Sequence, residues 1–162
     1  MRVIALTALA VTVLALAACS PKPAVPPLSA EANAQFLADN AKKDGVVSVQ
    51  GLQYEVLKKG TGAMPARHDC VTVYYKGSLI NGKVFDRTED GKPAVFPANR
   101  LIPGWVAALQ MMHVGDKWRL VIPSSLAYGK DGAGDGLIPP DQTLVFELEL
   151  LKVAPPTTEG CV

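Results

Sequence analysis

Three short segments hold the residues of this 162-residue chain that could do chemistry. They are rich in apolar, aromatic and turn-forming residues, and they read Arg100-Leu101-Ile102-Pro103-Gly104-Trp105, Leu126-Ala127-Tyr128-Gly129 and Leu137-Ile138-Pro139-Pro140. No phosphate-binding loop, cluster of metal ligands or nucleophile elbow accompanies them. A site of this composition works through shape, aromatic surface and backbone amides, so it suits a reaction that breaks no covalent bond.

In order and approximate spacing, these segments resemble the motifs of the FKBP-type peptidyl-prolyl cis/trans isomerases. The resemblance runs from about Gly51 to Val153 and includes Tyr75, the pair Phe85-Asp86 and Leu144-Val145-Phe146. It implies the FKBP fold and an enzyme that isomerises the peptide bond preceding proline. The subgroup to which it points is that of the bacterial Mip-like lipoproteins.

The resemblance also assigns residues to the site. Six positions match the catalytic pocket of the family: Tyr75, Phe85, Asp86, Trp105, Tyr128 and Phe146. Four more match its apolar substrate-binding walls: Leu101, Ile102, Leu137 and Ile138. The backbone N–H of Ile102 would receive a substrate or drug carbonyl, and the Tyr128 hydroxyl would bind the substrate backbone. No metal or cofactor is expected, and tacrolimus or rapamycin, which imitate a twisted proline amide in this family, are expected to compete for the site.

Rotation about a prolyl bond requires such an environment. Resonance holds the amide planar against a barrier of about 18–20 kcal/mol, and the uncatalysed exchange of an X-Pro bond is slow enough to limit folding. Water stabilises the charge separation of the planar form, so an apolar pocket weakens that form relative to the twisted one. The protein therefore needs an aromatic floor for the proline ring, one donor for a carbonyl, and walls that exclude water.

Trp105 and Asp86 each have a second interpretation. Trp105 is the candidate floor because it follows the Pro103-Gly104 turn directly, but periodicity alone fits a core tryptophan between helix and sheet equally well. Asp86 begins a polar run, and composition alone favours a solvated hairpin tip. The resemblance favours the pocket for both. Asp86 would then be a polar wall that orients Tyr75 and the twisted amide, not a proton-transfer base, since no proton has to move.

The chain departs from the human-type FKBP pattern at several positions. Ala94 stands where a phenylalanine often lies, and Arg100 replaces an acidic or amide residue. The loop after Asp86 is shorter than in that pattern, and the glycine-rich loop before Leu137 is longer. These changes bear on peptide preference and drug affinity more than on the type of reaction.

Alternating apolar and polar residues predict the strands that position these side chains. Four stretches alternate with a period of two: Leu52–Val56, Val71–Lys76, Lys117–Ile122 and Leu144–Leu150. A fifth, shorter strand is expected near Lys83–Phe85 or Ala94–Phe96, after the Asn81-Gly82 turn signal. One polar and one apolar face on each strand indicate an antiparallel sheet that is covered on a single side.

Two helices are predicted. Pro103 begins a short one with apolar residues on one face, and Gly115 marks its stop. Ser29 caps another that runs to a stop signal at Gly45. The predicted fold class is therefore α+β, and the resemblance adds a five-stranded antiparallel sheet wrapped around the Pro103 helix. The Ser29 helix resembles only the last part of the dimerising arm of Mip-like FKBPs, so we expect a monomer.

The first residues have the features of an export signal. Met1-Arg2 is a short positive start, and Val3–Leu16 is an apolar run shorter than the roughly twenty residues of a transmembrane helix. The run ends at Leu16-Ala17-Ala18-Cys19, which resembles the bacterial lipoprotein signal, with Cys19 lipidated. An ordinary secretory signal cut after a small residue is the alternative. By family analogy Ser20 favours the outer membrane, with the domain facing the periplasm or the cell surface.

These features divide the chain into five parts. They are a signal peptide (1–18), a proline-rich tether (19–28), a short helix and linker (29–50), the isomerase domain (51–153) and a C-terminal tail (154–162). Apart from Cys19, the chain holds Cys70 and Cys161, and an exported protein can join them by a disulfide. In the FKBP arrangement the strand that begins at Cys70 is antiparallel to the one that ends near Val153, which would bring the tail near Cys70.

Charge excludes one class of partner. Sixteen Lys and Arg against fifteen Asp and Glu leave a formal charge of +1, and no basic stripe indicates nucleic acid. The favoured interpretation is an isomerase that acts on proline-containing, unfolded exported polypeptides in the bacterial cell envelope. The alternative is a proline-binding chaperone or surface adhesion module with little catalysis. The full set of six pocket residues favours the enzyme, because a binding surface alone would not require all of them.

Overall fold

The computed structural model describes residues 28–158, 160 and 161. The predicted signal peptide, Cys19 and the tether up to residue 27 lie outside the described residues. Two α-helices are present, α1 (Ala30–Asn40) and α2 (Pro103–Leu109), with a short 3-10 helix η1 (Ser124–Leu126). The strands are β1 (Val46–Val49), β2 (Leu52–Lys58), β3 (Cys70–Leu79), β4 (Val84–Arg87), β5 (Ala94–Pro97), β6 (Lys117–Ile122) and β7 (Leu144–Ala154). None of the described helices is long and apolar enough to cross a membrane.

All strands join one antiparallel sheet in the order β1-β2-β6-β7-β3-β4, and β5 also pairs with β3. β4 lies beside Lys76–Ser78 and β5 beside Cys70–Val73, so they are two parts of one interrupted edge. Counted with that edge as one strand, β2, β6, β7 and β3 complete the predicted five-stranded sheet. The α+β class is confirmed, as are the four alternating strands.

The strand count differs from the prediction in two ways. Both candidates for the fifth strand form, because β3 is long enough to pair with one at each end. β1 was not predicted, and it extends the opposite edge by a tight hairpin with β2. Gln50 and Gly51 at the hairpin tip have φ values of 48° and 92°, the paired positive angles of a two-residue turn that matches strand twist.

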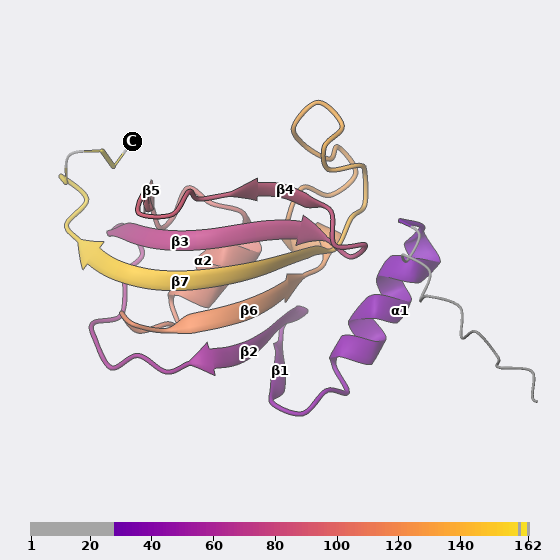
Figure 1. Ribbon diagram of the computed structural model, residues 1–162, viewed down its shortest axis with the longest axis horizontal. Coiled ribbons are helices and arrows are strands. Elements are labelled where there is room, and N and C mark those ends of the chain that lie inside the picture. Colours follow the sequence, from indigo (N-terminus) through magenta and orange to yellow (C-terminus); the bar gives the residue numbers. More distant parts are fainter. Residues whose placement is uncertain (1–27, 159, 162) are drawn as a thin grey trace, which may run out of the picture.

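α2 packs on the inner face of the sheet, where it crosses behind the central strands (Figure 1). Alternate residues of the strands point to this face and form one buried cluster with the helix. A Cβ on Gly104 would lie 2.5 Å from Cγ2 of Ile122 in β6. Glycine at this helical position therefore allows α2 to approach the sheet closely, which fixes the depth of Trp105 one residue later.

α1 stands at the end of the sheet (Figure 1), and its buried side chains are polar. Ser29 caps it as predicted, with its hydroxyl accepting from the Ala32 N–H. The buried residues of α1 are Asn33 and Asn40. Asn33 accepts from the backbone N–H of Thr143 at 2.7 Å, so α1 is tied to the start of β7.

Asn40 forms a second polar contact at the other end of α1. Its amide donates to Oε1 of Gln53 in β2 at 2.8 Å and accepts from Nη1 of Arg119 in β6 at 2.8 Å. The Gln53 amide in turn donates to the Leu37 carbonyl at 3.0 Å. Each hydrogen bond requires one orientation of its partner, so α1 has a defined position on the sheet.

The C-terminal tail returns to the start of β3. Cys70 stands opposite Ala154 in the β3–β7 register, and Cys161 donates its backbone N–H to the Thr158 carbonyl in a turn that follows Pro155. The structure joins Cys70 to Cys161 by a disulfide, with their Cα atoms 5.9 Å apart.

Candidate functional site

A cavity of about 310 Å³ opens between the N-terminus of α2 and the strand edge formed by β3, β4 and β5. All six residues predicted for the catalytic pocket line it, together with Leu101 and Ile102. They come from distant parts of the chain: β3 gives Tyr75, β4 gives Phe85 and Asp86, α2 gives Trp105, the turn after η1 gives Tyr128, and β7 gives Phe146.

Trp105 is the centre of an aromatic cluster in this cavity. Its ring meets Tyr75 at a centroid distance of 5.3 Å and Phe146 at 5.2 Å, with interplanar angles of 82° and 84°. Phe85 meets Phe146 at 5.6 Å and 84°. These edge-to-face contacts fix the ring orientations. Trp105 is only 4% exposed and belongs to the core cluster, so the core and pocket interpretations hold together.

Gly77 allows the rings to close over β3. A Cβ at this position would lie 2.6 Å from Cε1 of Phe146 and 2.7 Å from Cε2 of Phe85, closer than carbon atoms approach. The register of β3 with β4 also shifts between Gly77 and Ser78, which leaves Phe85 without a directly opposite partner. A β-bulge of this kind redirects a side chain, and here the side chain is that of Phe85.

Asp86 lies in β4 and turns its carboxylate toward the cavity instead of forming a solvated hairpin tip. The Tyr75 hydroxyl donates to its Oδ2 at 2.6 Å, and the Arg87 backbone N–H donates to its Oδ1 at 2.8 Å. Burial raises the pKa of the Tyr75 hydroxyl, and the bond to Asp86 raises it further. Burial and the charge of Asp86 also raise the pKa of Tyr128. Both hydroxyls therefore keep their protons at neutral pH and can donate.

Ile102 presents a backbone amide at the edge of the same cavity. Its carbonyl accepts from the N–H groups of Trp105 at 2.9 Å and Val106 at 3.1 Å, because Ile102 is the N-cap of α2. Its own N–H has no acceptor among the described residues. Proline follows at the first helical position, where a missing N–H costs nothing. The Ile102 amide is thus available to a carbonyl from outside the chain.

Leu137 and Ile138 lie outside the main cavity. They line an adjoining hollow of about 340 Å³ that shares Phe85, Asp86 and Tyr128 with it. Ile138 is 6% exposed and exchanges two backbone hydrogen bonds with Ala133, which closes the glycine-rich loop. Leu137 is 49% exposed at the tip of this loop. The predicted apolar wall is therefore divided between a buried anchor and an exposed edge.

Phe96 was not predicted as a site residue, yet it lines the cavity. It lies 6.3 Å from Trp105 and 6.1 Å from Tyr75 between ring centroids. β5 pairs Phe96 with Val71, a core residue of β3, so its ring faces the inner side of the sheet. The apolar run Ala94-Val95-Phe96 indicates a strand but not which side chain enters the cavity, since that depends on the pairing with β3.

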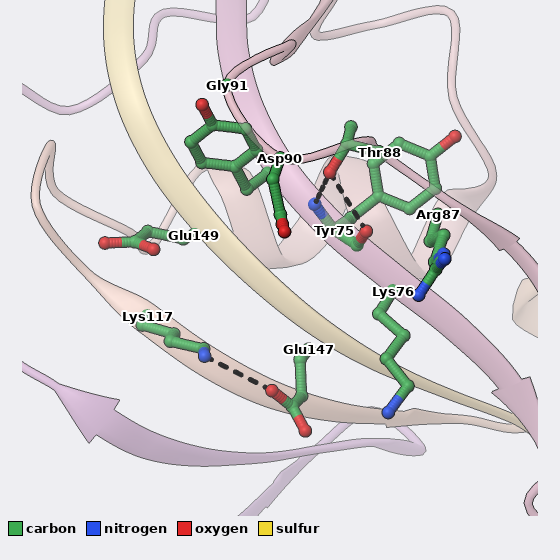
Figure 2. A pocket seen from close by; sticks show the side chains of 10 residues that line it. Tyr75, Lys76, Arg87, Thr88, Asp90, Gly91, Lys117, Glu147 and Glu149 are labelled. Atoms are coloured by element: carbon green, nitrogen blue, oxygen red, sulfur yellow. Dashed lines mark hydrogen bonds and ion pairs between the residues drawn. The ribbon is translucent and has the colours of Figure 1, made fainter.

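A larger hollow of about 420 Å³ lies on the outer face of the sheet (Figure 2). Its lining is mainly charged, and Lys117 is paired with Glu147 at 3.2 Å. Lys76, Glu147 and Glu149 alternate along their strands with core residues, which places them on the solvent side. Charged walls of both signs do not suit an apolar proline ring, so the smaller aromatic cavity is the candidate site. Among the described residues, no group of three or more metal-ligating side chains is present.

Comparison with known proteins agrees with the geometry of this cavity. Residues 62–151 match the family of FKBP-type peptidyl-prolyl cis-trans isomerases. The chain belongs to this family. A crystal structure of a peptidyl-prolyl cis-trans isomerase from Pseudomonas syringae superposes on this FKBP with a TM-score of 0.72 and 45% identity, covering 76% of this chain and 92% of that one.

Two curated relatives place this FKBP more narrowly. The FKBP-type 22 kDa peptidyl-prolyl cis-trans isomerase of Escherichia coli is 55% identical over 121 residues, 74% of this chain and 58% of that protein. The outer membrane protein MIP of Legionella longbeachae is 48% identical over 120 residues, 73% of this chain and 51% of that protein. The predicted Mip-like relationship is confirmed, and this FKBP spans about half the length of the curated relatives it matches.

Proposed function

We propose that this FKBP is a peptidyl-prolyl cis-trans isomerase that acts on proline-containing segments of unfolded, exported polypeptides. The observation that carries the proposal is the aromatic cavity, in which Trp105 forms the floor and Tyr75, Phe85 and Phe146 form walls. A volume of about 310 Å³ accommodates a proline ring with the atoms beside it. The family match supports the same activity.

In the proposed mechanism the cavity lowers the barrier by removing water from the amide. The planar amide is more polar than the twisted one, so apolar walls destabilise the planar form more than the transition state. The Ile102 N–H would hold a carbonyl of the substrate, and the Tyr128 hydroxyl would bind its backbone. Asp86 and Tyr75 would orient the twisted amide through hydrogen bonds. No covalent bond to the protein forms, and no proton is transferred.

The test is direct measurement of cis-to-trans exchange in a short X-Pro peptide with the purified protein. We expect acceleration above the uncatalysed rate and inhibition by tacrolimus or rapamycin, which would occupy the same cavity. Binding of proline peptides without acceleration of exchange would instead support a proline-binding chaperone or adhesion module.

We further propose that the chain is a lipoprotein anchored through Cys19 in the bacterial cell envelope. The support is the apolar run that ends at Leu16-Ala17-Ala18-Cys19, together with the relatedness to an outer membrane protein. We propose the outer membrane in particular because Ser20 follows Cys19, by analogy with other bacterial lipoproteins. Mass spectrometry of the mature protein should find a diacylglyceryl adduct on Cys19, and an unmodified mature N-terminus would refute the anchor.

We also propose that the protein is a monomer. α1 has only 11 residues, and its two buried asparagines are bonded to β2, β6 and the start of β7 within the same chain. This face of α1 is therefore occupied and cannot serve a second copy. Light scattering of the soluble protein at micromolar concentration should give the monomer mass, and a stable dimer would contradict the proposal.

A further inference from the structure

Arg100 lies between two hollows of the structure. It lines the aromatic cavity, and it also lines a smaller hollow of about 170 Å³ together with His68, Pro97, Asn99, Pro156 and Cys161. A polypeptide with its proline in the aromatic cavity would therefore find the smaller hollow beside it, on the far side of the Arg100 side chain.

The described lining of the aromatic cavity includes one acidic and one basic residue. Asp86 and Arg100 are the only charged residues among the described residues that line it. Asp86 already accepts from Tyr75 and from the Arg87 backbone. Arg100 is exposed and forms no ion pair with any described residue. Its guanidinium is therefore free to take a carboxylate in a two-pronged hydrogen bond.

Among the described residues, the lining of the smaller hollow includes donors and no acidic side chain. Nδ2 of Asn99 lies 3.0 Å from Nδ1 of His68. When Asn99 is the donor of this bond, the neutral imidazole carries its hydrogen on Nε2, which can donate to a group in the hollow. A carboxylate that enters the hollow would thus meet arginine, amide and imidazole donors, whereas an ammonium group would meet like charge.

Backbone contacts and the disulfide hold this hollow in shape. The Arg100 N–H donates to the Pro97 carbonyl at 3.1 Å, and Pro97 stands opposite Cys70 in the β3–β5 register. The disulfide joins Cys70 to Cys161, and Cys161 lines the hollow together with Pro156. Asn99 and Arg100 therefore stand on a segment anchored to β3, directly before the Leu101 and Ile102 wall, and His68 lies just before β3.

We propose that the hollow formed by His68, Asn99 and Arg100 binds an acidic side chain next to the proline of the polypeptide substrate. This inference rests on the proposed isomerase function, and it adds a substrate preference to it. Arg100 is the residue that determines the preference, because it alone borders both the proline cavity and the hollow.

The experiment compares kcat/KM for two series of short X-Pro peptides. One series carries Glu, Gln or Lys directly before the proline, and the other carries them directly after it. In at least one series we expect Glu to exceed Gln by about two- to fivefold, the range of an exposed charged pair, and to exceed Lys by more. High salt should reduce the difference, because it screens exposed charges.

Variants connect the preference to Arg100. Arg100→Gln should abolish the advantage of Glu over Gln, and Arg100→Glu should reverse the order of Glu and Lys. Lys152→Gln removes the same charge from an exposed position of β7 that lines none of these hollows, and it should leave the order unchanged.

Equal rates for Glu, Gln and Lys in both series would overturn the inference, as would an unchanged preference in Arg100→Glu. Failure of every peptide to isomerise would count against the isomerase function instead. In that case the affinities of the same peptides, measured by calorimetry, decide the question. Tighter binding of the Glu peptides that is lost in Arg100→Gln would support the hollow, and equal affinities would refute it.

Discussion

Phe85 and Asp86 are neighbours in β4, yet they contribute opposite properties to the cavity. Phe85 provides an apolar wall against Phe146, and Asp86 provides the one carboxylate that the described residues contribute to the lining. Adjacent residues of a strand normally point to opposite faces. The bulge opposite Gly77 and Ser78 breaks this rule locally, so both side chains reach the same cavity.

If removal of water drives the reaction, loss of apolar cover should harm catalysis as much as loss of the carboxylate. We expect Phe85→Tyr and Asp86→Leu each to lower kcat/KM by about one to two decades, or about 1.4–2.8 kcal/mol of transition-state stabilisation. The measurement is exchange of an X-Pro peptide by folded variants. His113→Ala is the control, because His113 does not line the cavity. Its short hydrogen bond to Asp116, at 2.6 Å, is donated by the backbone N–H and is kept in the variant. Full activity in both pocket variants would require another site.

The tyrosine hydroxyls predict a pH dependence. The pKa of Tyr75 is raised above its ordinary value of 10.0 by burial and by the bond to Asp86. A raised pKa in the folded state means that the stabilisation is complete below pH 10 and is lost as pH rises toward the folded value. Isomerase activity should therefore be flat from pH 6 to about 9. Denaturant unfolding above pH 10 should show a steeper loss of stability in the wild type than in Tyr75→Phe, and identical slopes would contradict this assignment.

Strand β3 lies against the aromatic rings of the site, and the rings of Phe85 and Phe146 approach its backbone closely at Gly77. Gly77→Ala would place a methyl group within 2.6 Å of Phe146 and 2.7 Å of Phe85. We expect a loss of about 1–3 kcal/mol in the free energy of unfolding, as for other overpacked sites, and a lower kcat/KM because both rings must shift. Ser78→Ala is the matched control on the next residue of β3. Urea unfolding and the peptide assay measure both effects, and wild-type values for Gly77→Ala would show that the rings are not confined.

α1 should depend on its asparagines more than on its apolar residues. Asn40→Ala removes the donor to Oε1 of Gln53 and the acceptor of the Arg119 guanidinium, so we expect a loss of about 1–3 kcal/mol. Gln35→Ala, also in α1, removes an exposed bond to Asp39 and should cost less than about 0.5 kcal/mol. Denaturant unfolding of both variants decides the point. Equal losses would mean that the polar contacts do not dock the helix.

The elements show which patterns a sequence discloses. β2, β3, β6 and β7 were predictable because apolar and polar residues alternate in their sequences, and burial follows this alternation most clearly in β3 and β7. β1 was not, because it is a short edge strand whose apolar residues are mostly exposed. The turn after β1 places Gln50 at positive φ, a conformation that a glutamine in the sequence does not predict. The buried face of α1 escaped prediction because its asparagines take partners that the fold brings from β2, β6 and the segment before β7.

The site was predictable to the extent that the family motifs are contiguous. The segments around Trp105 and Tyr128 and the pair Phe85-Asp86 could be recognised by order and spacing. The place of Phe96 could not, because its role depends on β5 pairing with β3 at Val71. The separation of Leu137 and Ile138 from the main cavity likewise depends on how the glycine-rich loop folds back on Ala133.

For the whole molecule, the disulfide is the longest-range covalent constraint, with a sequence separation of 91 between Cys70 and Cys161. Loss of such a crosslink costs about 2–5 kcal/mol, chiefly because the unfolded chain gains freedom. Cys161→Ser should therefore unfold at lower denaturant concentration than the oxidised wild type. Addition of a reductant should bring the wild type to the same midpoint and leave Cys161→Ser unchanged. If the reductant does not change the denaturant midpoint of the wild type, the disulfide does not form.

The same bond has a consequence for the protein after proteolytic attack. Every residue that lines the aromatic cavity lies between Cys70 and Cys161 in sequence. A single cut anywhere in that interval, for example in the exposed glycine-rich loop at Gly136, would open the backbone without separating its pieces. Tyr75 on one fragment and Phe146 on the other would remain covalently tethered and paired through β3 and β7. We therefore expect a nicked molecule to keep its cavity assembled.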